Sequence, residues 1–148
     1  MEWKLFHLHP AAVHFPIALL IAGAAAAGLR LRREAPWSSW AESRLLWLGT
    51  LSAWAALGLG LLAEKTAPHV PLAWEVLAEH EELAWRTVAV FTALSFLRLY
   101  AVRKGPDAGK LRAAQVVLWV IGLGLLVSTA MHGGELVFGF GVGVIGKE

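Results

Sequence analysis

The sequence predicts an all-α membrane protein, a single four-helix transmembrane domain over residues 1–148. Hydrophobic residues make up 57% of the chain and the mean hydropathy is +0.59, whereas a soluble domain is about 45–50% apolar. Four apolar runs lack charged side chains, and the long ones approach the roughly 20 residues that cross a bilayer core. Eight Trp residues accompany one Tyr, and Trp favours membrane–water interfaces.

The expected helices lie at about 11–31, 45–63, 82–102 and 111–131. The third uncharged run is the shortest, so its flanking Arg86 and Arg98 are expected to extend outward to water. A cleavable signal peptide is a poor alternative for the first helix. Its start carries only Lys4, offset by Glu2, and no small-residue cleavage site leads into polar sequence.

The basic residues predict the orientation of the bundle. An excess of Lys and Arg marks the cytoplasmic side, so both termini and the 64–81 connection should face outward. A bacterial inner membrane is the expected location, and the pI near 9.3 reflects this topology rather than nucleic-acid binding. Nine of the thirteen basic residues lie around the turns after the first and third helices: Arg30, Arg32, Arg33, Arg44, Arg98, Arg103, Lys104, Lys110 and Arg112.

The six histidines all fall on the predicted outer side. His80 lies on an apolar stripe at helical spacing, and His14 and His132 share helix faces with small residues such as Ala18 and Gly124. We therefore expect the rings of His14, His80 and His132 to point into the bundle within one outer layer. The remaining three, His7, His9 and His69, are expected to be solvated or interfacial.

Proline and glycine suggest how the two ends of the chain behave. Pro16 removes a backbone donor within the first helix, which frees the carbonyl near Ala12 and loosens the turn around His14. Gly133 and Gly134 are expected to end the fourth helix. The glycine-rich outer segment 133–148 should then fold back over the bundle with its apolar side chains directed inward.

A weak internal repeat links the second and fourth helices. Residues 54–69 and 119–132 both contain Gly-Leu-Gly-Leu-Leu followed by Thr-Ala-x-His. Two hairpins related by a pseudo-twofold axis along the membrane normal would explain this repeat, and it would pair His14 with His80 and His69 with His132. The alternative is coincidence, because Gly, Leu and Ala fill most membrane helices.

The two ends of the chain resemble one family. The stretch HPAAVHFPIALL at residues 9–20, His80, and GGELVFGFGVGV at residues 133–144 look like the bacterial four-helix membrane domain called domain of unknown function 2231. The resemblance implies an integral membrane domain that is sometimes joined to, or found beside, Rieske-type or cytochrome redox modules. The family often has a His where this chain has Phe140, which shifts interest to His132. The pattern carries over to His9, Pro10, His14, Phe15, Pro16, Gly133, Gly134, Leu136, Val137, Gly141, Val142 and Gly143.

The chemistry available to a ligand is limited to histidine, carboxylates and backbone, because the chain has no cysteine. The first hypothesis is a b-type cytochrome for electron transfer, with haem b bound by His14 and by His80 or His132. Arg86 would pair with a propionate, or alternatively with Glu82 at i, i+4. Four-helix bundles hold such cofactors between facing helices.

Two other functions remain open. One is a Cu- or Zn-binding membrane protein that uses His14, His80 and His132 with nearby glutamates, although transport is disfavoured because the cytoplasmic half shows no ionisable pathway. The other is a structural subunit or anchor without a cofactor. An enzyme acting alone is not expected. The expected partners are the lipid bilayer, an outer redox protein of Rieske or cytochrome type, or a second copy of the chain, but not nucleic acid.

Overall fold

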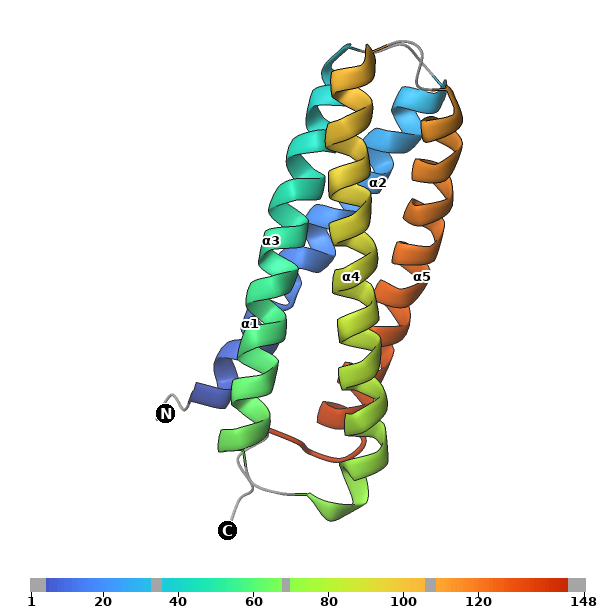
Figure 1. Cartoon of the computed structure of the whole chain (residues 1–148). Coiled ribbons are helices and arrows are strands. Elements are labelled where there is room, and N and C mark those ends of the chain that lie inside the picture. The colour runs from blue at the N-terminus through green and yellow to red at the C-terminus, as the bar shows by residue number, and fades with distance from the viewer. Residues whose placement is uncertain (1–4, 33–35, 68–69, 106–108, 144–148) are drawn as a thin grey trace.

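The computed structural model describes residues 5–32, 36–67, 70–105 and 109–143 (Figure 1). Four helical segments there are long and apolar enough to cross a membrane. The all-α, four-helix fold is therefore confirmed. In chain order the elements are η1 (Leu5–His7), α1 (Leu8–Ala12), α2 (His14–Arg32), α3 (Pro36–Thr66), η2 (Pro71–Ala73), α4 (Trp74–Lys104) and α5 (Gly109–Phe138).

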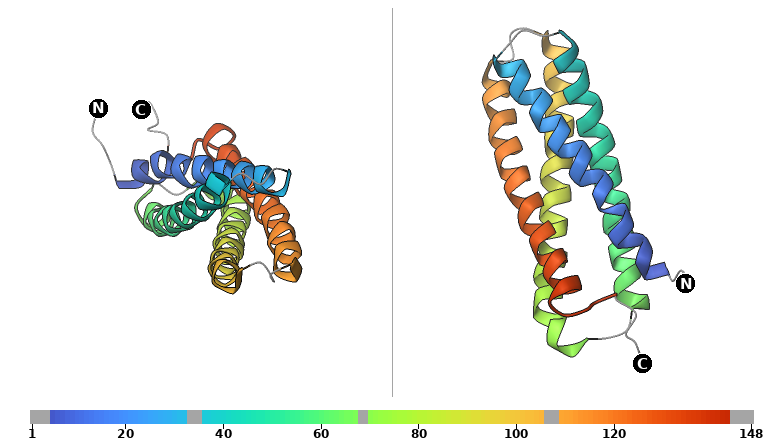
Figure 2. Two further views of the ribbon diagram at one scale, coloured as in Figure 1. Left: turned by 90° about the horizontal axis from the view of Figure 1, so that it is seen from above. Right: turned by 180° about the vertical axis from the view of Figure 1, so that it is seen from behind.

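The four long helices form two hairpins. α2 packs along α3, and α4 packs along α5. The hairpins meet mainly through α3 and α4, whereas α2 and α5 contact each other at few points. Figure 2 shows the consequence from behind, where α2 and α5 lie close at one end of the bundle and diverge toward the other.

Glycines allow the helices of each hairpin to approach closely. A Cβ atom on Gly49 of α3 would lie 2.6 Å from Leu20 of α2, and one on Gly122 of α5 would lie 2.9 Å from Phe91 of α4. Small residues let membrane helices approach closely, and dispersion contacts then stabilise their packing, because the hydrophobic effect does not drive helices together inside lipid. Leu20 and Phe91 belong to one buried cluster that also includes Trp119.

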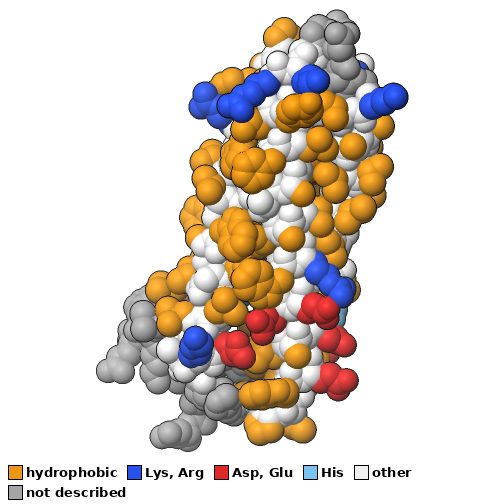
Figure 3. Space-filling model, in the orientation of Figure 1, with side chains coloured by type: hydrophobic (Ala, Val, Ile, Leu, Met, Phe, Trp, Pro, Cys, Tyr) orange, Lys and Arg blue, Asp and Glu red, His pale blue; other side chains and the backbone are white. Residues whose placement is uncertain are grey.

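Charged side chains gather at the two ends of the molecule. In Figure 3 Lys and Arg lie mostly at one end, Glu gathers toward the other, and apolar side chains cover most of the surface between them. Trp37 and Trp40 are 59% and 63% exposed near the basic end. This arrangement is the one expected of a bundle that spans a bilayer with Trp near the interface.

Three of the four long helices, α3, α4 and α5, are longer than the sequence predicted. α3 begins at Pro36 rather than near residue 45, and α5 continues to Phe138. The prediction that Gly133 and Gly134 end the last helix is therefore wrong. Gly133 packs instead against the ring of His80, with an added Cβ only 3.1 Å from its Cε1 atom, so this glycine lies within α5 and allows a close contact with α4.

After α5 the chain turns and crosses the end of the bundle toward α3 (Figures 1 and 2). Gly141 has φ +67°, a left-handed conformation that favours glycine past a helix end. The Val142 amide donates to the Leu136 carbonyl at 2.8 Å. Residues 139–143 thus fold back as predicted, but Phe138 is 91% exposed rather than directed inward. Residues 144–148 lie outside the described part of the chain.

Candidate functional site

His9 is the first histidine that the structure brings into the bundle. It lies on the short helix α1, and its Nδ1 donates to the Ala56 carbonyl of α3 at 2.9 Å. The ring packs on Gly60, where a Cβ would lie 3.1 Å from Cε1. Pro10 follows in the first turn of α1, a position that tolerates proline because its amide needs no helical partner. The prediction that His9 lies outside the helix as an interfacial side chain is wrong.

His80 has the same environment in the second hairpin. Its Nδ1 donates to the Thr129 carbonyl of α5 at 3.0 Å, and its ring packs on Gly133. The prediction that His80 faces inward is confirmed. Because a carbonyl only accepts hydrogen bonds, Nδ1 carries the proton in both rings, which leaves Nε2 as the nitrogen available to a ligand.

The structure supports a repeat of two hairpins, but in a register different from the predicted one. His9 corresponds to His80, just as Leu20 corresponds to Phe91, with a shift of 71 residues in both pairs. Gly49 corresponds to Gly122 and Gly60 to Gly133, with a shift of 73 residues. In each half a histidine ring packs on a glycine, and its Nδ1 donates to the carbonyl of the residue four positions before that glycine.

The two equivalent histidines meet between the hairpins. The ring centroids of His9 and His80 are 6.2 Å apart, and the rings are nearly perpendicular at 78°. Within the part of the chain that the structure describes, neither Nε2 has a hydrogen-bond partner. Each ring is thus held by the backbone through Nδ1, and its Nε2 is left without a protein partner among these residues.

In the second hairpin only, a further histidine, His132, contacts an acidic side chain. Its Nδ1 donates to the Ser128 carbonyl at 2.9 Å, and its Nε2 lies 3.3 Å from the Glu79 carboxylate. By the shifts of the repeat, Leu8 and Leu59 occupy the equivalent positions in the first hairpin. We call His9, His80, His132 and Glu79 the histidine cluster.

His14 does not belong to this cluster. Its side chain is exposed, and its Nδ1 lies 3.4 Å from the carbonyl of Ala11, three residues earlier in α1. The prediction that His14 points into the bundle is wrong, because α2 buries the opposite face, with Pro16 and Leu20. The expected repeat partner of His132, His69, lies outside the described residues.

Arg86, the remaining predicted site residue, and His7, which the sequence placed at the surface, have simpler positions. Arg86 forms an exposed ion pair with Glu82 one turn earlier, which is the alternative that the sequence left open. His7 packs edge-on against Phe6 with ring centroids 4.5 Å apart. Among the described residues no group of three or more His, Asp or Glu side chains is arranged to hold a metal ion.

A second polar cluster lies at the other end of the bundle, and the sequence analysis missed it. Glu42 of α3 has no exposed surface. Arg30 of α2 binds its carboxylate at 2.6 Å, Arg98 of α4 at 3.2 Å, and the Trp119 indole of α5 donates to it at 3.3 Å. One carboxylate therefore joins all four long helices. With Gln115, these residues form what we call the glutamate cluster.

The buried position of Arg98 explains why the sequence did not predict this cluster. It was expected to extend outward to water, but it is only 5% exposed and also donates to the hydroxyls of Ser39 and Ser43 at 2.7 and 3.1 Å. The predicted start of the second helix near residue 45 left Glu42 in a loop. The signal was present, since Glu42, Leu46, Gly49 and Ala53 form a stripe at helical spacing.

Comparison with known proteins adds a family to this geometry. No curated protein and no solved structure matches the chain. A family model described as "Predicted membrane protein (DUF2231)" matches residues 6–146 and so includes both polar clusters. The chain belongs to this family of predicted membrane proteins.

Proposed function

We propose that the histidine cluster binds haem b through His9 and His80, and that the protein transfers electrons within the membrane. The observation that carries this proposal is the symmetric pair of inward rings, 6.2 Å apart. Both rings would hold the iron through Nε2, because Nδ1 of each donates to a backbone carbonyl. Haem iron would supply one-electron oxidation and reduction when bound.

The backbone supports of the two rings fit residues that would hold a haem iron. Metal-binding histidines usually donate their second N–H to a carbonyl or carboxylate, which fixes the ring and its tautomer. The carbonyls of Ala56 and Thr129 provide this support at 2.9 and 3.0 Å. Room for a flat cofactor would have to open between the hairpins at this end, where α2 and α5 already diverge (Figure 2).

Absorption spectroscopy tests the proposal on protein purified in mild detergent from haem-sufficient cells. We expect a Soret band and, after dithionite reduction, a sharp α band. His9→Ala and His80→Ala should each abolish the low-spin spectrum. His14→Ala is the matched control and should keep it, because the His14 side chain is exposed.

Metal analysis of the same sample separates the competing functions. Stoichiometric Cu or Zn without haem, lost in His80→Ala, would favour the metal-binding protein instead. A colourless preparation that neither binds added haemin nor retains metal would reject both kinds of site. The structural-subunit function would then remain.

We further propose that the histidine cluster faces the outside of a bacterial inner membrane, where an outer redox protein would reach it. The support is the excess of Lys and Arg at the opposite end (Figure 3). Single cysteines at Ala67 and Gly105 test this orientation in a chain without other cysteines. An impermeant thiol reagent should label Ala67→Cys in intact cells, and labelling of Gly105→Cys would contradict the proposal.

A further inference from the structure

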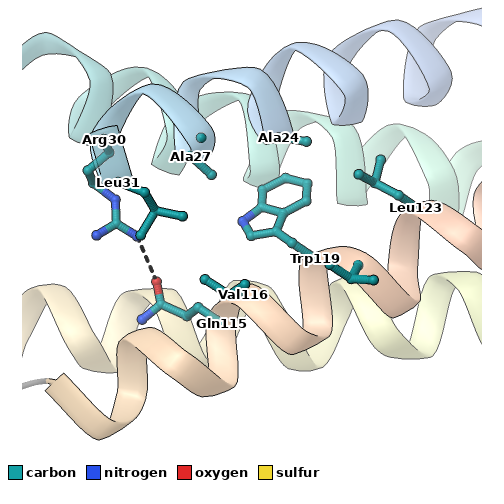
Figure 4. Close-up of a pocket in the computed structure, with 10 residues that line it drawn as sticks. Ala24, Ala27, Arg30, Leu31, Gln115, Val116, Trp119 and Leu123 are labelled. Carbon is teal, nitrogen blue, oxygen red and sulfur yellow. Dashed lines mark hydrogen bonds between the residues drawn. The ribbon is translucent and has the colours of Figure 1, made fainter. Parts of the chain in front are cut away.

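A cavity opens between α2 and α5 near the glutamate cluster, at the end where these helices lie close (Figure 4). It has a volume of about 180 Å³. Arg30 and Gln115 lie at its polar end, where the Arg30 guanidinium donates to the Gln115 side-chain oxygen at 3.4 Å. Apart from these two residues the lining is apolar: Ala24, Ala27, Gly28, Leu31, Val116, Trp119, Val120 and Leu123.

The position of the cavity defines what can reach it. Its walls belong to two membrane-spanning helices, and its outer edge is formed by residues such as Val120, which is 66% exposed. The cavity is therefore open to the hydrocarbon of the bilayer. From Ala24 to Arg30 it extends over six residue steps along α2, which corresponds to about 9 Å.

The polar end of the cavity carries an excess of positive charge. Arg30 and Arg98 share the single carboxylate of Glu42, so these three side chains have a net charge of +1. Arg30 lies two residues before the end of α2 at Arg32, so it lies near the end of this candidate membrane span. Basic pockets between transmembrane helices are typical sites for anionic lipid headgroups.

We propose that this cavity binds one anionic phospholipid, with a segment of an acyl chain against Trp119 and the phosphate at Arg30. The volume is smaller than the roughly 300–1,000 Å³ of pockets that enclose a whole small ligand. It fits part of a chain, with the rest of the lipid lying along the surface of the bundle. The lipid would join α2 to α5, which contact each other at few points.

Thermal unfolding of the detergent-purified protein tests the proposal with three additives. Phosphatidylglycerol at a large excess should raise the Tm by about 5 °C over phosphatidylcholine, because a ligand of the folded state stabilises it. Inorganic phosphate should have no effect. An equal response to both lipids would indicate boundary lipid only, and a response to phosphate alone would place the site outside the cavity. Either result overturns the proposal.

A pair of matched variants locates the site. Gly28 and Gly58 both have open space around an added Cβ, but only Gly28 lines the cavity. Gly28→Leu should weaken the effect of phosphatidylglycerol about tenfold in apparent affinity, whereas Gly58→Leu should leave it unchanged. Native mass spectrometry of the unmodified protein gives an independent measurement. It should retain one phosphatidylglycerol per chain, and retention of none, or of phosphatidylcholine equally, would refute the site.

Discussion

The glutamate cluster and the histidine cluster are both polar groups within an apolar bundle, but their bonding differs. Glu42 is fully buried and uses both carboxylate oxygens, with partners from α2, α4 and α5. His9 and His80 are partly buried and each bonds the backbone through Nδ1 alone. A polar group whose bonding capacity is filled by the protein holds helices together, whereas one with a nitrogen to spare can accept a ligand.

The largest effect should follow from removal of the Glu42 charge. Glu42→Gln leaves the guanidinium groups of Arg30 and Arg98 buried without a counter-charge, and breaking a buried pair in this way costs about 3–5 kcal/mol. We expect a large fall in the unfolding free energy, measured by denaturant titration in mixed micelles. Glu82→Gln is the control, because its ion pair with Arg86 is exposed and should contribute less than about 1 kcal/mol. Equal losses in both variants would contradict a structural role for Glu42.

A smaller effect is expected where the histidines rest on glycine. Gly60→Ala and Gly133→Ala place a methyl group 3.1 Å from the ring of His9 or His80, and such overpacking costs about 1–3 kcal/mol. Gly58→Ala and Gly124→Ala meet open space and should gain up to about 1 kcal/mol, because Ala is the better helix former. Thermal unfolding of the four variants measures the difference. If all four are stabilised alike, the rings are not held on these glycines.

The smallest effect is expected at His14. Its side chain is exposed and contacts only the backbone carbonyl of Ala11, three residues earlier, so His14→Ala should change the unfolding free energy by less than about 0.5 kcal/mol. The same denaturant titration measures it beside Glu42→Gln. A loss as large as that of a buried residue would show that His14 has a partner in the folded protein.

Apolar runs predicted the number of helices and the class of the fold, because a membrane helix needs only length and hydropathy to be recognised. The stripe around His80 also predicted its inward face. Which histidine meets His80 depended on the packing of α1 against α3, and spacing within one helix carries no such information. The same limit applied to Glu42, since its partners Arg30 and Arg98 come from helices far away in the sequence.

Because the chain is interrupted between α1 and α2, His9 is held less rigidly than His80. His80 is part of the continuous 31-residue helix α4, whereas His9 stands on a five-residue helix that is separated from α2 at Val13. Pro16 cannot donate to the Ala12 carbonyl, so one bond that would stiffen this junction is missing. A ligand that enters between the rings would therefore shift the short helix α1, while the long helix α4 stays in place. Amide hydrogen exchange should accordingly be faster at residues 8–12 than around His80.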